Sequence, residues 1–236
     1  PASISRKRLP QETSVTNPDQ EPGAASPPPI LPAEIQTERL ILRPFRLGDV
    51  DDVLAYARDP EWSRYLRLLP RPYEREHAEQ FVARQLLLDP TSHPAWAVTL
   101  TGSVIGGVNL RFAFEHRSVE IGYSIARSQW NRGIGTEAAR AAVDAAFTTH
   151  LELNRLFARA DVENVGSHRV LEKLGMTREG VLRKNRVERG EAIDEAYYSI
   201  LRGEWEVLSP RHRRRRLADP PVSTPSPKPG GRRREQ

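Results

Sequence analysis

The sequence predicts a mixed α+β domain in which about four helices flank one central sheet of about seven strands. Runs with the apolar period of two that is typical of strands alternate irregularly with runs of helical period. Their order along the chain is β-α-α-β-β-β-α-β-α-β-β. Some strands therefore follow one another directly while helices separate others, which predicts a mixed sheet. The 38% of apolar residues is enough for one core.

The first half of this domain contains three predicted strands and two predicted helices. An apolar run before Pro44 forms the first strand, and two amphipathic helices follow that end at Pro60 and Pro90. A Thr101-Gly102 turn joins the next two strands. The predicted ranges are strand 40–42, helix 49–58, helix 74–88, strand 95–100 and strand 104–112.

The second half begins with the stretch that organises the chain, residues 119–147, VEIGYSIARSQWNRGIGTEAARAAVDAAF. It reads as a strand, a polar turn, two glycines and a long helix. Alanine and other apolar residues at steps of three and four give this helix one apolar face. The elements predicted after it are strand 155–162, helix 164–174, strand 177–187 and strand 191–201, with Gly190 in the last turn.

The joint between this strand and its helix suits an anionic ligand. Gly133 and Gly135 lack side chains that would keep a phosphate away, and Arg132 adds positive charge. The helix start adds unpaired N–H groups and a positive dipole end, so we expect a phosphate on backbone amides. A glycine turn without a ligand is one alternative. A dinucleotide fingerprint, G-x-G-x-x-A ending at Ala138, is another, although the polar turn before it disfavours that reading.

Three blocks, in this order and spacing, carry a family resemblance: VEIGYSIARSQWNRGIGTEA, ELNRLFARADVENVGSHRVLEKLGM and EGVLRKNRVERGEAIDEAYYSILRGEWE. They resemble the GNAT superfamily of acetyl-CoA-dependent N-acetyltransferases. More narrowly, they are similar to the Rim-type branch, which acetylates the N-terminal amine of ribosomal proteins. The resemblance covers residues 36–208, including the opening TERLILRPF. It implies the GNAT fold, with a mixed, mostly antiparallel, splayed sheet, and acetyl-CoA as co-substrate without a metal.

The resemblance also implies where acetyl-CoA binds. In this fold the strand before the glycine turn and the next strand start side by side and then diverge, and pantetheine enters the gap. An N–H group there would polarise the thioester carbonyl. Where the family usually has Gln or Arg, this chain has Trp130, which weakens the case for a side-chain phosphate contact. The candidates are Ser124, Ile125 and Ala126 for pantetheine, and Asn131, Arg132, Gly133, Ile134, Gly135 and Thr136 for the pyrophosphate.

Further candidates lie at the short helix 164–174. The resemblance implies that Asn164 contacts pantetheine and that Ser167 lies near the sulfur, where a hydroxyl can donate to the departing thiolate. Many family members carry a tyrosine acid at the position of Leu171, so its absence favours Ser167 in that role. Lys173 is a candidate for the nucleotide phosphates. Structural alternatives are a helix N-cap for Asn164 and a solvated charge for Lys173.

Glu120 is the candidate general base. An amine must lose a proton before it attacks, and Glu120 corresponds in place to a base of the family. The second glutamate of some Rim-type enzymes is missing, because residues 183–186 hold no carboxylate and the next is Glu188. A solvated glutamate and a bound water as proton acceptor are alternatives. We expect direct transfer in a ternary complex without an acyl-enzyme. The absence of cysteine agrees with this, because the commonest acyl-carrying side chain is missing.

The two ends of the chain differ from the domain in composition. Residues 1–35 and 209–236 are rich in proline and are predicted to be disordered. The basic end, 209–236, is interpreted either as an arm for RNA or the ribosome or as a solvated tail. Without cysteine there is no disulfide or thiolate metal site. No apolar run reaches the length of about 18 residues of a membrane span, so we expect a cytoplasmic protein without membrane contact.

Three functions therefore stand side by side. The first is acetylation of the N-terminal amine of a protein, such as a ribosomal protein. The second is acetylation of a small amine, such as a polyamine, an aminoglycoside or an amino acid. The third is a non-catalytic acyl-CoA-binding protein held at the ribosome or RNA by its basic end. The Rim-type resemblance also implies a homodimer.

Overall fold

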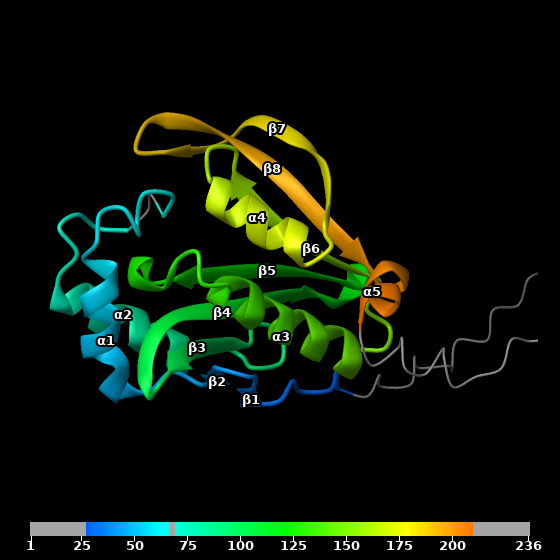
Figure 1. Ribbon diagram of the computed structural model, residues 1–236, viewed down its shortest axis with the longest axis horizontal. Helices are drawn as coiled ribbons and strands as arrows, with labels where there is room; N and C mark the ends of the chain where they lie inside the picture. Colours follow the sequence, from blue (N-terminus) through cyan, green and yellow to red (C-terminus); the bar gives the residue numbers. More distant parts are fainter. Residues whose placement is uncertain (1–26, 67–68, 210–236) are drawn as a thin grey trace, which may run out of the picture.

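Eight strands form the sheet of the computed structural model, in the spatial order β1-β2-β3-β4-β5-β6-β8-β7 (Figure 1). The structure describes residues 27–66 and 69–209. Neighbouring strands are antiparallel except β5 and β6, which are parallel. The strands are β1 Ile35–Gln36, β2 Ile41–Arg43, β3 Ala95–Leu100, β4 Ser103–Ala113, β5 Ser118–Ile125, β6 Arg155–Asp161, β7 Thr177–Glu188 and β8 Glu191–Leu201.

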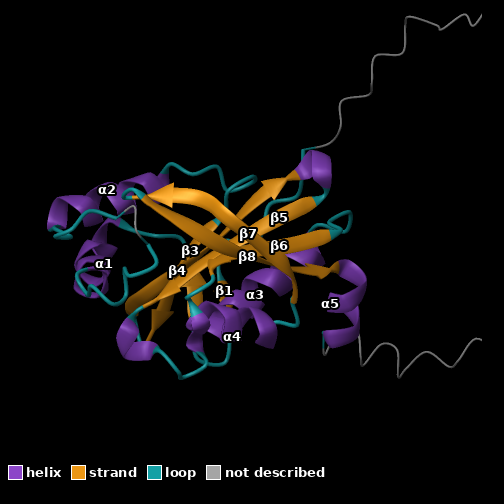
Figure 2. Ribbon diagram, turned by 90° about the horizontal axis from the view of Figure 1, so that it is seen from above, coloured by secondary structure: helices purple, strands orange, loops and turns teal. Residues whose placement is uncertain are grey.

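The helices form two groups around this sheet. α1 and α2 contact each other, and α1 also contacts β4, whereas α3 contacts β4, β5 and α4. Figure 2 shows α3 and α4 together, away from α1 and α2. No helix within the described ranges has the length and apolarity needed to cross a membrane. The helices are α1 Val50–Ala57, α2 Arg75–Leu86, α3 Ile134–Thr149, α4 Val165–Lys173 and α5 Arg202–Leu208.

The predicted order of strands and helices is confirmed, and the structure adds two elements to it. β1 has two residues, which is too short to show an alternating pattern. α5 has seven residues and buries only Trp205, so its sequence carries no helical period. Trp205 stacks on Phe147 of α3 with ring centroids 5.1 Å apart, and this long-range contact holds α5 in place.

The apolar face of α3 forms the centre of the core. Its buried residues are mostly alanines, which bring the helix close to β4 and β5, and Phe147 supplies bulk at the far end. The exposed fraction of each of these residues is 2% or less, so the period seen in the sequence corresponds to the buried face. They are Ile134, Ala138, Ala139, Ala142, Val143, Ala146 and Phe147.

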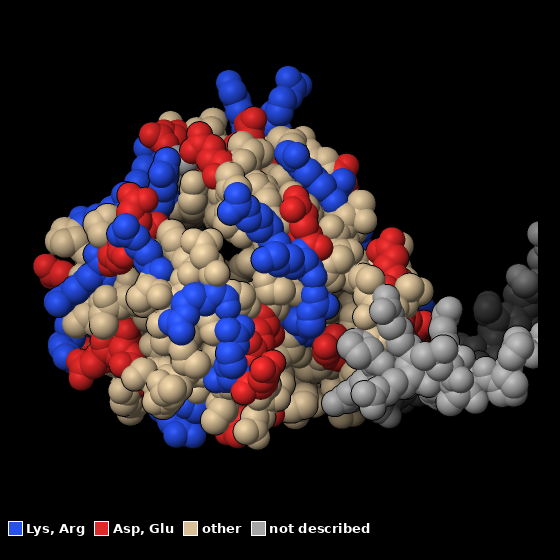
Figure 3. Space-filling view, in the orientation of Figure 1, with Lys and Arg blue, Asp and Glu red and all other residues tan. Residues whose placement is uncertain are grey.

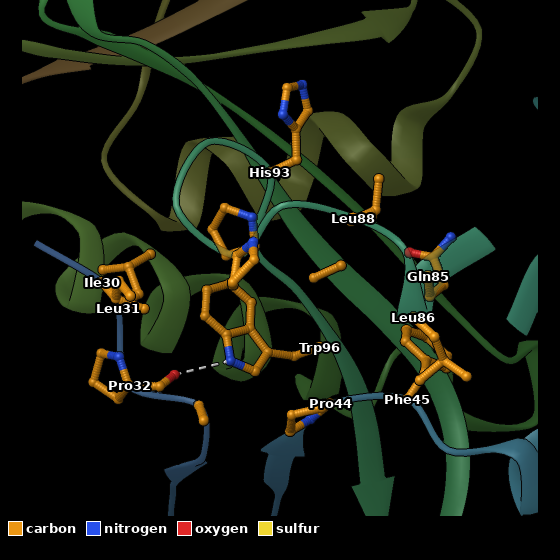
Figure 4. Close-up of a pocket in the computed structure, with 14 residues that line it drawn as sticks. Ile30, Leu31, Pro32, Pro44, Phe45, Gln85, Leu86, Leu88, His93 and Trp96 are labelled. Atoms are coloured by element: carbon orange, nitrogen blue, oxygen red, sulfur yellow. Dashed lines mark hydrogen bonds between the residues drawn. The ribbon is translucent and has the colours of Figure 1, made fainter. Parts of the chain in front are cut away.

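The packed part of the chain begins before residue 36, contrary to the prediction that residues 1–35 are all disordered. Leu31 is buried in the core. The indole N–H of Trp96 donates a hydrogen bond to the Pro32 carbonyl over 3.1 Å (Figure 4). Both residues line a small, mainly apolar pocket with a volume of about 270 Å³. Residues 1–26, and nearly all of the basic end 209–236, lie outside the described residues.

The two central strands separate partway along their length. β4 and β5 pair from Ala113↔Ser118 to Gly106↔Ile125, and β6 pairs along its whole length with β8. In contrast, β5 and β6 pair only at Ser118↔Arg155, Val119↔Leu156 and Glu120↔Phe157. The C-terminal half of β5 therefore has no strand beside it on the β6 side. This divergence was expected from the family resemblance, and it opens the sheet at its middle.

Candidate active site

A cleft with a volume of about 680 Å³ lies where β5 and β6 diverge. Its walls come from β5, the following turn, the start of α3, the end of β6, α4, one residue each from β7 and β8, and the segment after α1. Most of the candidates named from the sequence meet here, although they come from three separate segments. Those that line the cleft are Ser124, Ile125, Asn131, Gly133, Ile134, Gly135, Thr136, Asn164, Ser167 and Lys173.

The glycine turn places a helix start at this cleft. Gly133 is the N-cap residue of α3 with φ 76° and ψ 0°, a left-handed conformation that glycine adopts without steric cost. The first bond of the helix runs from the Glu137 N–H to the Gly133 carbonyl, over 3.0 Å. The N–H groups of residues 133–136 therefore have no acceptor within the helix. Together with the helix dipole they form a site suited to an anion.

Gly135 has a different local role. A Cβ at this position would lie 3.6 Å from Val170 of α4 and 3.7 Å from Ile125 of β5, which are ordinary contact distances. The missing side chain thus faces the packing between helix and strand. The expectation that Gly133 makes room for a phosphate stays a prediction, and the structure gives Gly135 a packing role instead.

An acidic residue in the first turn of α3 is neutralised from outside the helix. Arg39 donates to Glu137 from its backbone N–H (2.9 Å) and its Nε (2.7 Å), and the Thr37 hydroxyl donates over 2.6 Å. Burial alone would raise the pKa of Glu137, but these hydrogen bonds outweigh it and lower the pKa. Arg39 also donates to the Arg132 carbonyl over 2.9 Å. The N-terminal segment therefore braces the turn and cancels a charge that would repel a phosphate.

Trp130, which stands where the family usually has Gln or Arg, makes a structural contact. Its indole N–H donates to the carbonyl of Ile125 over 2.7 Å, at the end of β5. The ring lines the cleft. This residue therefore holds the end of the strand through its side chain.

The structure places Ala126 and Arg132 beside the cleft, outside its lining. The Ala126 N–H donates to the Ile105 carbonyl of β4 over 2.7 Å, so it is already engaged within the sheet. The Arg132 side chain donates to Gln129 over 2.6 Å. Of the three residues expected to contact pantetheine, Ser124 and Ile125 reach the cleft.

Asn164 is the N-cap of α4, as its structural alternative predicted. Its Oδ1 accepts a hydrogen bond from the Ser167 N–H over 3.0 Å. This cap fixes the first turn of α4 and with it the position of the Ser167 backbone. The Ser167 hydroxyl lies 2.9 Å from the hydroxyl of Tyr123, which reaches α4 from β5. Leu171, further along α4, is fully buried.

Glu120 does not line the cleft itself, but it is bonded to an arginine that does. The Arg159 Nε donates to Glu120 over 2.8 Å, and Arg111 lies 3.6 Å from the other carboxylate oxygen. The hydrogen bond with Glu120 raises the pKa of Arg159. Arg159 itself lines the cleft. The alternative of a freely solvated glutamate therefore does not describe Glu120.

Sequence reasoning missed a carboxylate that lines the cleft. Glu195 of β8 is 2% exposed, accepts a hydrogen bond from Asn185 over 2.6 Å and lies 3.5 Å from Arg186. Residues 183–186 of β7 hold no carboxylate, but the neighbouring strand supplies one. A charged residue inside the apolar run of β8 was the available signal, because such residues are rarely buried without a partner.

The described residues contain no group of three or more His, Cys, Asp or Glu side chains that could hold a metal ion. The residues gathered at the cleft are instead backbone donors, hydroxyls and paired charges. The start of α3 suits binding of the phosphate groups of a ligand. The hydroxyl pair near the unpaired half of β5 suits a thioester whose thiolate departs.

Comparison with known proteins agrees with this geometry. A family model described as "Acetyltransferase (GNAT) domain" matches residues 39–177. "Uncharacterized N-acetyltransferase p20" from Bacillus licheniformis is 33% identical over 175 residues, 72% of this chain and 97% of that protein. "Putative ribosomal N-acetyltransferase YdaF" from Bacillus subtilis (strain 168) is 40% identical over 106 residues, 44% of this chain and 57% of that protein.

A solved structure of similar shape agrees as well. The crystal structure of a GNAT-family acetyltransferase from Bacillus anthracis has a TM-score of 0.64 and 30% sequence identity. The match covers 72% of this chain and 99% of that one. The chain therefore belongs to the GNAT acetyltransferase family, and it is an enzyme that takes its acetyl group from acetyl-CoA.

Proposed function

We propose that the enzyme acetylates the N-terminal amine of a protein, such as a ribosomal protein. The observation that carries this choice is the charge of the cleft. A polyamine would favour a strongly anionic pocket, whereas the cleft mixes both signs. Its basic residues are Arg64, Arg159, Arg169, Lys173 and Arg186, and its acidic residues are Glu61, Asp161, Glu163 and Glu195.

Two further observations support this proposal. Basic and acidic side chains are also interspersed over the face shown in Figure 3, which therefore offers no extended anionic surface for a polycation. The similarity to YdaF, whose name places it among ribosomal N-acetyltransferases, points to the same acceptor class. A contact of residues 209–236 with the ribosome and a homodimer remain predictions.

In the proposed mechanism the N–H groups at the start of α3 hold the diphosphate of acetyl-CoA. The pantetheine arm lies along the unpaired half of β5, next to Ser124 and Ile125, with Asn164 near it. The acceptor nitrogen attacks the acetyl carbonyl, a carbon–nitrogen bond forms, and the carbon–sulfur bond breaks with its electron pair on sulfur. Ser167 donates a hydrogen bond to the departing thiolate. Holding both reactants in one cleft supplies much of the rate.

An ammonium acceptor must lose one proton before its nitrogen attacks, and we propose that Glu120 takes this proton through a water at the edge of the cleft, beside Arg159. The second proton leaves the nitrogen as the amide forms and neutralises the departing thiolate. Replacing Glu120 with glutamine should lower kcat at neutral pH by about 10- to 100-fold. The loss should shrink at higher pH, because more of the amine is then already deprotonated in solution. A pH profile of both enzymes from pH 6 to 10 measures this, with Glu115→Gln as the matched control on the exposed turn. A loss that is constant with pH would contradict the role of a base.

The acceptor class is tested by thiol release from acetyl-CoA over a panel of acceptors. The panel contains peptides with free N-termini, the same peptides with blocked N-termini, spermidine and an aminoglycoside. We expect kcat/KM to be at least about 10-fold higher for a free peptide than for the small amines, and no turnover with blocked peptides. Faster turnover of a small amine would replace the proposed acceptor with the second class named from the sequence.

A further inference from the structure

Tyr123 of β5 contacts Ser167 of α4, which the alternating pattern of β5 does not predict. Its hydroxyl lies 2.9 Å from the Ser167 Oγ and donates to the Ser167 carbonyl over 3.2 Å. Both residues line the cleft. The two residues are 44 positions apart in the chain, so the contact depends on the packing of α4 against the open half of β5.

We propose that Tyr123 is a positioning residue that directs the Ser167 hydroxyl toward the sulfur of acetyl-CoA. This inference rests on the proposed function and deepens it. In this chain the phenol comes from the strand, since the helix position that carries tyrosine in many family members holds the buried Leu171. Tyr123 acts through Ser167 and has no direct contact with the substrate in this scheme.

The hydrogen-bond inventory of the pair explains how the direction is set. A serine hydroxyl has one hydrogen and can accept two hydrogen bonds, and a phenol has one hydrogen. When Tyr123 donates to the Ser167 carbonyl, the serine hydrogen is directed back at the phenol oxygen. When Tyr123 donates to the Ser167 Oγ instead, the serine hydrogen is free to face the cleft. An anionic sulfur in the cleft favours the second arrangement.

Burial keeps Tyr123 in the form that this role needs. Removal from water raises the pKa of its phenol, so the hydroxyl remains protonated and can donate at neutral pH. No proton leaves Tyr123 during the reaction. The bond changes are those of the transfer itself, and Tyr123 contributes one hydrogen bond before and after the carbon–sulfur bond breaks.

The test is a double-mutant cycle with Tyr123→Phe, Ser167→Ala and the double variant. Thiol release from acetyl-CoA is measured for each, with an acceptor that the wild-type enzyme acetylates. We expect Tyr123→Phe to lower kcat by about 10-fold with the KM for acetyl-CoA within about twofold. The double variant should be no slower than Ser167→Ala alone, because the phenol acts only through the serine. Tyr198→Phe is the control, since Tyr198 is a buried tyrosine that packs on His168 of α4.

Two results would overturn the inference while leaving the proposed function intact. One is a Tyr123→Phe enzyme with the kcat of the wild type. The other is a double variant whose loss is the product of the two single losses, which would mean that the residues act independently. Wild-type enzyme that turns over no protein or peptide acceptor would instead contradict the proposed function. Melting temperatures of all variants show whether a loss of kcat comes from a loss of folded protein.

Discussion

Replacing Ser167 by alanine is expected to lower kcat by about 100-fold and to leave the KM for acetyl-CoA within about twofold. In the proposed mechanism the hydroxyl acts only when negative charge develops on sulfur, so its loss should affect the transition state and not the bound ground state. The fold should persist, because the cap of α4 uses the backbone N–H of Ser167, which alanine keeps. Steady-state kinetics with acetyl-CoA as the varied substrate measure both constants.

Ser199→Ala is the matched control for this variant. The Ser199 hydroxyl is buried and donates to Glu179 over 2.7 Å, outside the cleft. It should leave kcat unchanged, although the lost hydrogen bond costs about 1 kcal/mol of stability. A Ser167→Ala enzyme with wild-type kcat would show that the thiolate leaves without help from this residue. It would contradict a catalytic role for α4.

Replacing Gly106 by alanine is expected to destabilise the protein by about 3 kcal/mol and to weaken acetyl-CoA binding at least about 10-fold. A Cβ at Gly106 would lie 2.1 Å from the carbonyl oxygen of Ser124 and 2.9 Å from the Cα of Ile125. Both are backbone atoms of β5, so β4 and β5 would have to move apart at the edge of the cleft. The register of β3 and β4 is also irregular here, between Val98 and Thr99.

Thermal unfolding and acetyl-CoA titration test this variant together. For a chain of this size, 3 kcal/mol corresponds to a fall in Tm of about 6–12 °C. Gly180→Ala is the control, because Gly180 lies in β7 and a Cβ there would meet nothing within 4 Å. Its Tm should be unchanged or slightly higher. A Gly106→Ala protein with the Tm and the acetyl-CoA affinity of the wild type would show that the close approach of β4 to β5 is not required.

Local patterns in the sequence were sufficient for the order of elements and for one wall of the cleft. The alanine face of α3 and the glycine turn at its start are properties of neighbouring residues, and periodicity shows them directly. The family resemblance added the divergence of β5 and β6, which no local pattern encodes. With that divergence, residues from the glycine turn and from α4 could be expected in one place.

The contacts that sequence reasoning missed join segments far apart in the chain. The Tyr123–Ser167 pair, the Arg39–Glu137 pair and the ion pair of Arg159 with Glu120 span 39 to 98 positions. In its own segment each side chain resembles a common residue of a strand or of the surface, so the local sequence does not indicate its partner. Only the register of the sheet and the packing of helices on it give these side chains their partners.

We propose that the N–H groups at the start of α3 bind the diphosphate of acetyl-CoA. Calorimetric titration of the full chain with acetyl-CoA, and separately with acetyl-pantetheine, which lacks the diphosphate and the nucleotide, tests it most directly. We expect acetyl-CoA to bind with a Kd of about 1–100 µM, or about −8 to −5.5 kcal/mol, and acetyl-pantetheine to bind at least about 10-fold more weakly. No heat with acetyl-CoA, or equal affinity for the two compounds, would contradict it.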